Sequence, residues 1–193
     1  QHTIKKLNYN VETINYNCEY ITKPYRLVNL KNKGLFSYIY GVLGFISYLP
    51  RKKKCDEFRK YLNYSKLVNK ETVKNLDCEY DMFITGSDQV WNYRLTNFDK
   101  SYFLDFVTDN NKKNSYSASF GINKIPTEYK NEYSELLKIF NNISVREESA
   151  IEMVEDLSGK EVQATLDPTL LLTAEEWDKV IDNRNYFEEE YVL

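Results

Sequence analysis

Short apolar runs of strand length alternate with segments of helical periodicity along this chain, and this alternation constrains the fold more than any other feature. The sequence predicts strands over residues 11–16, 80–85, 102–106, 114–119, 143–146 and 162–166. It predicts helices over residues 127–140, 148–157 and 174–181. Strands that alternate with helices at this spacing form a mostly parallel sheet flanked by helices. The predicted fold class is therefore α/β, and the length of the chain suits one domain.

Two of the predicted helices carry recognisable signals at their ends. Ser158 and Gly159 follow the helix over residues 148–157, and glycine is the residue that most often ends a helix in the left-handed conformation. Thr173 and Glu176 match a capping box, in which a hydroxyl and a carboxylate satisfy the free amides of the first turn. The last helix is therefore expected to begin at Ala174.

Size, charge and cysteine usage exclude several classes of protein. The chain has 193 residues, 42% of them hydrophobic and 28% charged, which is typical of a folded domain. Its net charge is −3 and its basic residues are interleaved with acidic ones, so we expect no nucleic-acid partner. Cys18, Cys55 and Cys78 fit neither a disulfide framework nor a zinc site, and we expect free thiols in a reducing cytoplasm. No cluster of His, Cys or carboxylates has ligand spacing, so no metal is predicted.

Both ends of the chain resemble interrupted elements. Ile4 and Leu7 indicate the last turns of a helix, and residues 186–193 indicate a charged linker that enters a strand. We therefore expect the chain to be a piece of a longer protein. The opening residues lack the apolar core of a secretory signal, which favours a cytoplasmic location.

The segment from Gly34 to Pro50 has no charged residue and is followed at once by Arg51-Lys-Lys-Lys54. It is short for a membrane span, and its glycines and serines weaken that interpretation further. One hypothesis is a peripheral contact of residues 35–54 with the inner face of the plasma membrane, with the basic run on anionic headgroups. The sequence favours the other hypothesis, a helix packed on the sheet with a solvated Lys-rich continuation.

Small and polar residues follow the predicted strand that ends at Thr85. In an open parallel sheet, ligands bind beyond the carboxyl ends of the strands. Gly86 would let backbone amides approach an anion, because it has no side chain. Hydroxyl, carboxylate and amide groups suited to a sugar follow it, from Ser87, Asp88, Gln89 and Asn92. The structural alternative is a helix capped by Ser87 or Asp88, with Trp91 in the core.

Two further strand ends carry candidate residues. Arg146 leaves the strand over residues 143–146, where a guanidinium can grip phosphate or carboxylate, and Glu147 follows it. A structural salt bridge to a nearby acid explains Arg146 equally well. Asp167 ends the strand over residues 162–166, and a turn-forming hydrogen bond before Pro168 accounts for it.

Several of these stretches, taken in order, closely resemble the polysaccharide pyruvyl transferase family. The motifs that carry the resemblance are DMFITGSDQVWN with Tyr80 before it, YFLDF over residues 102–106, SYSASFG over residues 115–121, ISVRE over residues 143–147 and LDPT over residues 166–169. Residues 11–16 resemble the second strand of the family. The resemblance covers nearly the whole chain.

The resemblance implies a two-domain fold similar to the GT-B glycosyltransferases, with the active site between the domains. Residues 1–185 would form the amino-terminal Rossmann-like domain without its first strand, and residues 186–193 would be the linker and start of an absent carboxy-terminal domain. It implies transfer of the pyruvyl group of phosphoenolpyruvate to two hydroxyls of a sugar, forming a ketal in bacterial surface polysaccharide biosynthesis. The donor is then a substrate, and no cofactor is expected. This chemistry needs a proton donor, a base and cations for the donor.

The resemblance also suggests roles for individual residues. Arg146 would contact the donor anion, and Asp88 would serve as base or hydroxyl anchor for the acceptor. Ser87 and Gln89 would support Asp88, while Gly86, Asn92, Glu147 and Asp167 would complete the substrate contacts. The family's Gly-rich loop and its second-domain histidine are not found here, and His2 lies in the wrong place, so this piece alone is expected to be inactive.

Two other functions are compatible with the residues. A nucleotide-sugar glycosyltransferase would share the two-domain architecture but not these motifs. A noncatalytic carbohydrate-binding or membrane-docking module would use the same polar strand ends without turnover.

Overall fold

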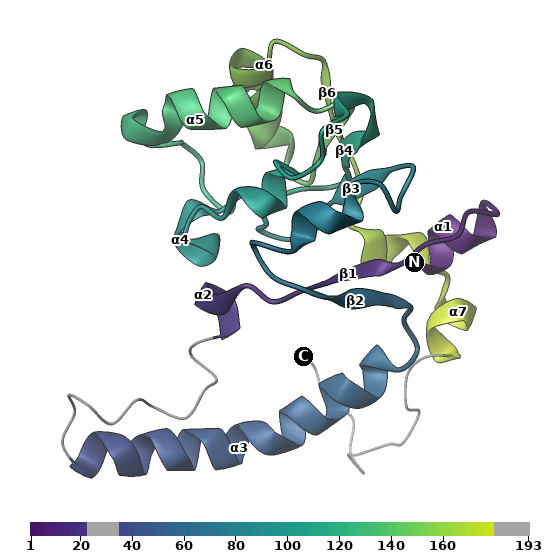
Figure 1. Ribbon diagram of the computed structural model, residues 1–193. Coiled ribbons are helices and arrows are strands. Elements are labelled where there is room, and N and C mark those ends of the chain that lie inside the picture. Colours follow the sequence, from purple (N-terminus) through teal and green to yellow (C-terminus); the bar gives the residue numbers. More distant parts are fainter. Residues whose placement is uncertain (23–34, 180–193) are drawn as a thin grey trace.

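Six short strands, all paired in parallel, form the framework of this computed structural model, which describes residues 1–22 and 35–179 (Figure 1). The strands are β1 (Thr13–Tyr16), β2 (Tyr64–Val68), β3 (Phe83–Thr85), β4 (Lys113–Ser115), β5 (Ile143–Val145) and β6 (Val162–Ala164). Parallel strands with helical connections confirm the predicted α/β class.

Four of the strands lie in the spatial order β3, β4, β5, β6. Ladders join β3 to β4 and β5 to β6, and isolated parallel bridges join the two ladders at Asn114 with Asn142 and at Ala118 with Val145. Backbone amides confirm the central contact, since that of Ser115 donates to Asn142 O at 3.0 Å. Because all four strands run the same way, their carboxyl ends meet at one edge. The pair β1–β2 lies beside this sheet as a separate parallel ladder.

Five of the six predicted strands overlap an observed strand, but the observed strands are shorter. The predicted strand over residues 114–119 ends at Ser115, because Ser117 adopts a left-handed φ of 51° that interrupts the ladder. The predicted strand over residues 102–106 is wrong. The chain forms a 3-10 turn at Lys100–Phe103 instead, begun by the Asp99 side chain, which accepts the Ser101 amide.

Helices connect the strands and cover the sheet. The α-helices are α1 (His2–Lys6), α2 (Glu19–Thr22), α3 (Leu35–Arg59), α4 (Tyr93–Thr96), α5 (Thr127–Lys138), α6 (Ile151–Ser158) and α7 (Ala174–Asp178). The 3-10 turns are η3 (Val73–Leu76), η4 (Lys100–Phe103), η5 (Asn110–Lys112), η6 (Glu148–Ala150) and η7 (Pro168–Leu171). In Figure 1, α5 and α6 lie side by side, and contacts between them agree.

Both predicted helix ends are confirmed. Gly159 closes α6 at φ 67°, with its amide donating to Glu155 O at 2.8 Å. Thr173 and Glu176 form the capping box at the start of α7, where Glu176 Oε2 accepts the Thr173 amide at 2.9 Å. The end predicted for this helix at Ile181 lies outside the described residues, as does the predicted linker over residues 186–193.

The long helix α3 runs through Pro50 without a break and ends at Arg59. It joins the predicted uncharged segment to its basic continuation, although Gly34 and the side chains of residues 35–45 are not described. The predicted packing on the sheet is not seen for Ile46 and Leu49, which are 55% and 43% exposed. Within the described residues, no helix is both long enough and apolar enough to cross a membrane.

Trp91 lies at the centre of an aromatic core and fixes the loop after β3. Its side chain is fully buried, stacks on Phe103 with ring centroids 5.6 Å apart, and contacts Phe120 and Phe140. The indole N–H donates to the Tyr102 carbonyl at 3.2 Å. The prediction that Trp91 belongs to the core is therefore confirmed, and this anchor holds the preceding polar residues at the edge of the sheet.

Candidate functional site

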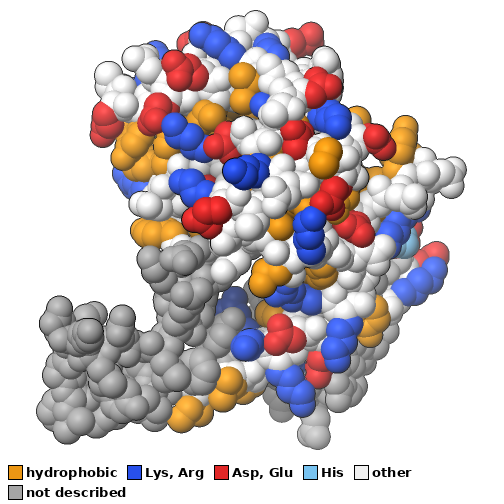
Figure 2. Space-filling model, in the orientation of Figure 1, with side chains coloured by type: hydrophobic (Ala, Val, Ile, Leu, Met, Phe, Trp, Pro, Cys, Tyr) orange, Lys and Arg blue, Asp and Glu red, His pale blue; other side chains and the backbone are white. Residues whose placement is uncertain are grey.

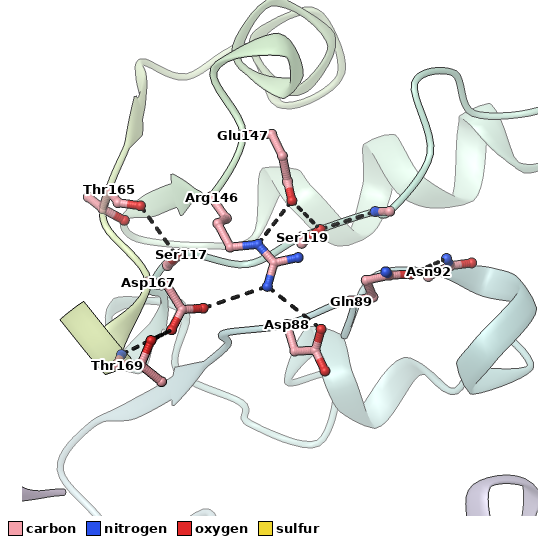
Figure 3. Close-up of polar contacts among 11 residues, drawn as sticks. Asp88, Gln89, Asn92, Ser117, Ser119, Arg146, Glu147, Thr165, Asp167 and Thr169 are labelled. Atoms are coloured by element: carbon pink, nitrogen blue, oxygen red, sulfur yellow. Dashed lines mark hydrogen bonds and ion pairs between the residues drawn. The ribbon is translucent and has the colours of Figure 1, made fainter. Parts of the chain in front are cut away.

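The candidate site lies where β3, β4, β5 and β6 end. The loops that follow these strands meet there, as expected for a parallel sheet (Figure 3). They bring together four charged side chains predicted from the sequence, Asp88, Arg146, Glu147 and Asp167.

Arg146 is the centre of this cluster. Its Nη1 lies 3.7 Å from Asp88 Oδ1 and 3.6 Å from Asp167 Oδ2, and its Nε donates to Glu147 Oε1 at 3.0 Å. The hydrogen bond to Glu147 is the main cause that raises the pKa of the guanidinium, and the charges of the three acids add to it. The predicted salt bridge to a nearby acid is thus confirmed.

The cluster carries more negative than positive charge. Three ionised carboxylates around one guanidinium give a formal charge of −2, and no other cation of the described chain pairs with these acids. The Asp88 side chain is 84% exposed, whereas that of Arg146 is 29% exposed. Among the described residues none pairs with Arg146 Nη2, and Figure 3 draws this nitrogen without a contact. The site therefore offers one accessible carboxylate and one unpaired guanidinium nitrogen.

Asp167 combines the predicted turn with an ion pair. Its Oδ1 accepts the Thr169 amide at 3.0 Å and the Thr169 hydroxyl at 2.7 Å, which confirms the turn-forming hydrogen bond. The Thr169 amide is the main cause that lowers the pKa of Asp167, and hydrogen bonding from Ser87 and the charge of Arg146 act in the same direction.

Ser119 is a site residue that the sequence analysis did not identify. Its fully buried hydroxyl donates to Glu147 Oε1 at 2.7 Å and accepts the Gly121 amide at 3.1 Å. Its backbone N–H donates to Asp88 O at 2.9 Å, and its carbonyl accepts the Trp91 amide at 3.1 Å. Ser119 therefore contacts the backbone of one charged site residue and the side chain of another. The signal in the sequence was the alternation of serine at positions 115, 117 and 119.

A second set of hydroxyls joins the strand ends behind Arg146. Ser144 Oγ donates to Ser115 O at 3.2 Å and accepts from the Ser117 amide and the Thr165 hydroxyl, each at 3.0 Å. One donated and two accepted bonds use the full capacity of a hydroxyl. Ser117 is fully buried and donates to Thr165 O at 3.3 Å. The backbone that carries Arg146 is thus held on both sides.

Three predicted substrate contacts have structural roles in this arrangement. A Cβ on Gly86 would lie 2.0 Å from Tyr116 O, so the missing side chain makes room for that carbonyl. Asn92 is 5% exposed, and its Oδ1 accepts the Arg94 amide at 3.0 Å as the cap of α4. Its Nδ2 donates to Gln89 Oε1 at 2.8 Å. The cap considered at Ser87 or Asp88 is therefore wrong, while substrate contact by Gly86, Gln89 and Asn92 stays a prediction.

A comparison with known families shows to which family the chain belongs. The family model for polysaccharide pyruvyl transferase matches residues 1–192. The chain belongs to the polysaccharide pyruvyl transferase family. Neither the curated proteins nor the solved structures gave a match.

Membership of the polysaccharide pyruvyl transferase family assigns the chain to transferases of polysaccharide biosynthesis with a saccharide acceptor. Across residues 1–22 and 35–179, no group of three or more His, Cys, Asp or Glu side chains is placed to hold a metal ion. The Nε2 of His2 lies 3.2 Å from Glu176 Oε1, in the first turn of α7.

Proposed function

We propose that the protein transfers the pyruvyl group of phosphoenolpyruvate to two hydroxyls of a saccharide, forming a cyclic ketal. One observation carries the proposal: Asp88 and Arg146 meet at 3.7 Å at the carboxyl edge of the sheet. Asp88 presents an exposed carboxylate and Arg146 an unpaired Nη2. A base for an acceptor hydroxyl thus lies next to a cation for an anionic donor, as transfer between the two requires.

The proposed reaction places specific demands on these two groups. Protonation of the methylene carbon of phosphoenolpyruvate turns its C2 into an electrophile, to which the first sugar hydroxyl adds as it loses its proton. The C2–O bond to phosphate then breaks, and the second hydroxyl adds at the same carbon. One hydroxyl proton ends on the new methyl group in the overall balance, and the other leaves with phosphate. Asp88 would accept a hydroxyl proton, and Arg146 Nη2 would bind the donor carboxylate or phosphate.

The proposal also concerns the domain arrangement of the whole enzyme. The domain would be one Rossmann-like half of a GT-B-like enzyme, with its carboxyl-edge site facing a second domain. The parallel direction of β3, β4, β5 and β6 supports this assignment, because ligands of open parallel sheets bind beyond the carboxyl ends of the strands.

The test is release of phosphate from phosphoenolpyruvate by the full-length protein in the presence of lipid-linked saccharides, with the ketal measured by mass spectrometry. We expect Asp88→Asn to lower kcat by roughly 10²- to 10⁴-fold, the usual contribution of a general base. Arg146→Lys keeps a charge but loses the guanidinium fork, and we expect a loss of about 100-fold.

Asp81→Asn is the matched control, because Asp81 is an exposed carboxylate that precedes β3 and lies outside the cluster. Its turnover should equal that of the wild type. Phosphate release that does not require a saccharide, or inhibition by a sugar nucleotide but not by a donor analogue, would refute pyruvyl transfer. Turnover unaffected by either site variant would refute the assigned roles.

A further inference from the structure

The basic end of α3 directly continues an uncharged helical segment. It is defined here as Arg51, Lys52, Lys53, Lys54 and Arg59 of the helix, together with Lys60 directly after it. No charged residue occurs between Leu35 and Pro50, and the helix continues through Pro50. Because there is no turn between the two parts, Lys52 and Lys53 lie three and four residues after Leu49, on the same side of the helix. Apolar and cationic side chains therefore share one surface.

The described apolar side chains of this surface face solvent. Ile46 is 55% exposed and Leu49 is 43% exposed, and Arg51, Lys52 and Lys53 are exposed beside them. In Figure 2, hydrophobic and basic side chains lie next to one another over α3 at the lower edge of the molecule. Exposed apolar side chains next to cationic ones suit the boundary between the headgroups and the acyl chains of a membrane.

The far end of the helix is fixed to the rest of the protein. Arg59 Nη2 donates to Asn15 Oδ1 at 2.9 Å, and its guanidinium lies 4.8 Å from the centre of the Tyr64 ring. These contacts tie α3 to β1 and β2. The exposed surface is therefore presented by an anchored helix.

The distribution of charge indicates what this surface binds. Residues 51–60 contain six basic and two acidic residues, a charge of +4, while the whole chain carries −3. The remainder of the chain therefore carries −7. An anionic surface would attract the basic end of α3 and repel the remainder, which orients the protein with α3 toward that surface.

We infer that α3 docks on an anionic lipid bilayer, with Ile46 and Leu49 at the level of the acyl chains and the neighbouring lysines on phosphate headgroups. Polybasic stretches next to exposed apolar side chains bind anionic leaflets, with the cations on the headgroups and the apolar groups below them. A bilayer satisfies both the apolar and the cationic groups, whereas a nucleic acid would leave Ile46 and Leu49 exposed. This inference does not depend on the proposed reaction, because its test measures binding and not turnover.

The experiment is co-sedimentation of the full-length protein with vesicles of phosphatidylcholine, alone or with roughly one third phosphatidylglycerol. We expect binding to the anionic vesicles only, and Lys52→Glu/Lys53→Glu should weaken it at least about tenfold. Lys70→Glu/Lys74→Glu is the matched control, since it reverses two exposed lysines outside α3, and its binding should equal that of the wild type. Circular dichroism checks that both variants are folded.

Two further measurements separate the lipid surface from other partners. Ile46→Ser/Leu49→Ser should weaken vesicle binding even though it changes no charge. Raising NaCl from about 0.1 M to about 1 M shortens the Debye length from about 10 Å to about 3 Å, and binding should fall accordingly. Equal effects of the two lysine variants, or no binding to anionic vesicles, would overturn the inference. So would binding to duplex DNA as tight as binding to vesicles, because this would indicate a general polyanion site.

Discussion

Replacement of Ser119 by alanine tests whether the site depends on a residue that touches no substrate. The variant removes the 2.7 Å hydrogen bond to Glu147 and the 3.1 Å bond from the Gly121 amide. A hydrogen bond to a charged group contributes about 1.5–3 kcal/mol, and the lower end applies because Glu147 is 38% exposed and water can replace the lost donor. Gly121 is exposed, so its amide also regains a water partner. We expect a loss of about 2 kcal/mol in the free energy of unfolding, measured with urea.

The same variant should also lower activity. Glu147 Oε1 accepts from both Ser119 and Arg146 Nε, so without Ser119 the carboxylate is free to turn toward solvent and Arg146 loses a fixed partner. We expect kcat/KM to fall about tenfold, equivalent to about 1.4 kcal/mol. Ser134→Ala is the matched control, because Ser134 also donates one 2.7 Å bond, to Leu157 O on the far side of the domain. It should cost about 1 kcal/mol of stability and leave turnover unchanged.

A double-mutant cycle makes this reasoning refutable. If Ser119 acts through Glu147, adding Ser119→Ala to Glu147→Ala should cost little further activity, because Glu147→Ala already removes the acceptor that joins Ser119 to Arg146. Strictly additive losses in the cycle would show that Ser119 acts by another route. Equal turnover of folded Ser119→Ala and folded Ser134→Ala would show that the bond is structural alone.

Two further predictions concern the backbone and the pH dependence of the site. Gly86→Ala places a Cβ 2.0 Å from Tyr116 O at φ 127° and should lower the free energy of unfolding by about 3 kcal/mol or more. Gly159→Ala is the control, because Gly159 has a φ of 67° and a Cβ there would meet nothing within 4 Å, so it should cost about 1 kcal/mol. Equal losses of stability in urea titrations of the two variants would contradict the steric argument. The pKa of Asp167 is lowered in the folded state, so its contribution is complete above the unfolded pKa of about 3.9 and is lost as pH falls through the folded value. Asp167→Asn should therefore flatten the decline of stability below about pH 4 in urea titrations at successive pH values, and an unchanged slope would refute the assignment.

The charged part of the site was predictable because it depends on one rule of topology. Asp88, Arg146 and Asp167 each follow a predicted strand, and the carboxyl ends of parallel strands meet at one edge. Which partner each residue takes was not predictable, because it depends on loop conformation. Asp88 has a φ of 55° and Ser117 a φ of 51°, and left-handed serine and aspartate residues have no reliable sequence signal.

The elements that the sequence missed share a different cause. In β2, Ser65 and Val68 are buried while Leu67 is 68% exposed, so the strand lacks the alternation by which half-buried strands are recognised. Around Phe103, the apolar run that suggested a strand forms a 3-10 turn, and this turn places both Phe103 and Leu104 in the core. In both cases burial of particular side chains in the tertiary structure outweighed the local pattern.

The charge of the cluster sets a condition on donor binding. Phosphoenolpyruvate carries a carboxylate and a phosphate, and at Arg146 it would meet three carboxylates and one guanidinium. One guanidinium among three carboxylates does not offset the charge of such a donor, and the lowered pKa of Asp167 keeps that carboxylate ionised. The additional positive charge must therefore come from outside the residues that contact Arg146 here. It follows that the acceptor, whose hydroxyls suit a carboxylate-rich surface, gains more than the donor from this edge of the sheet.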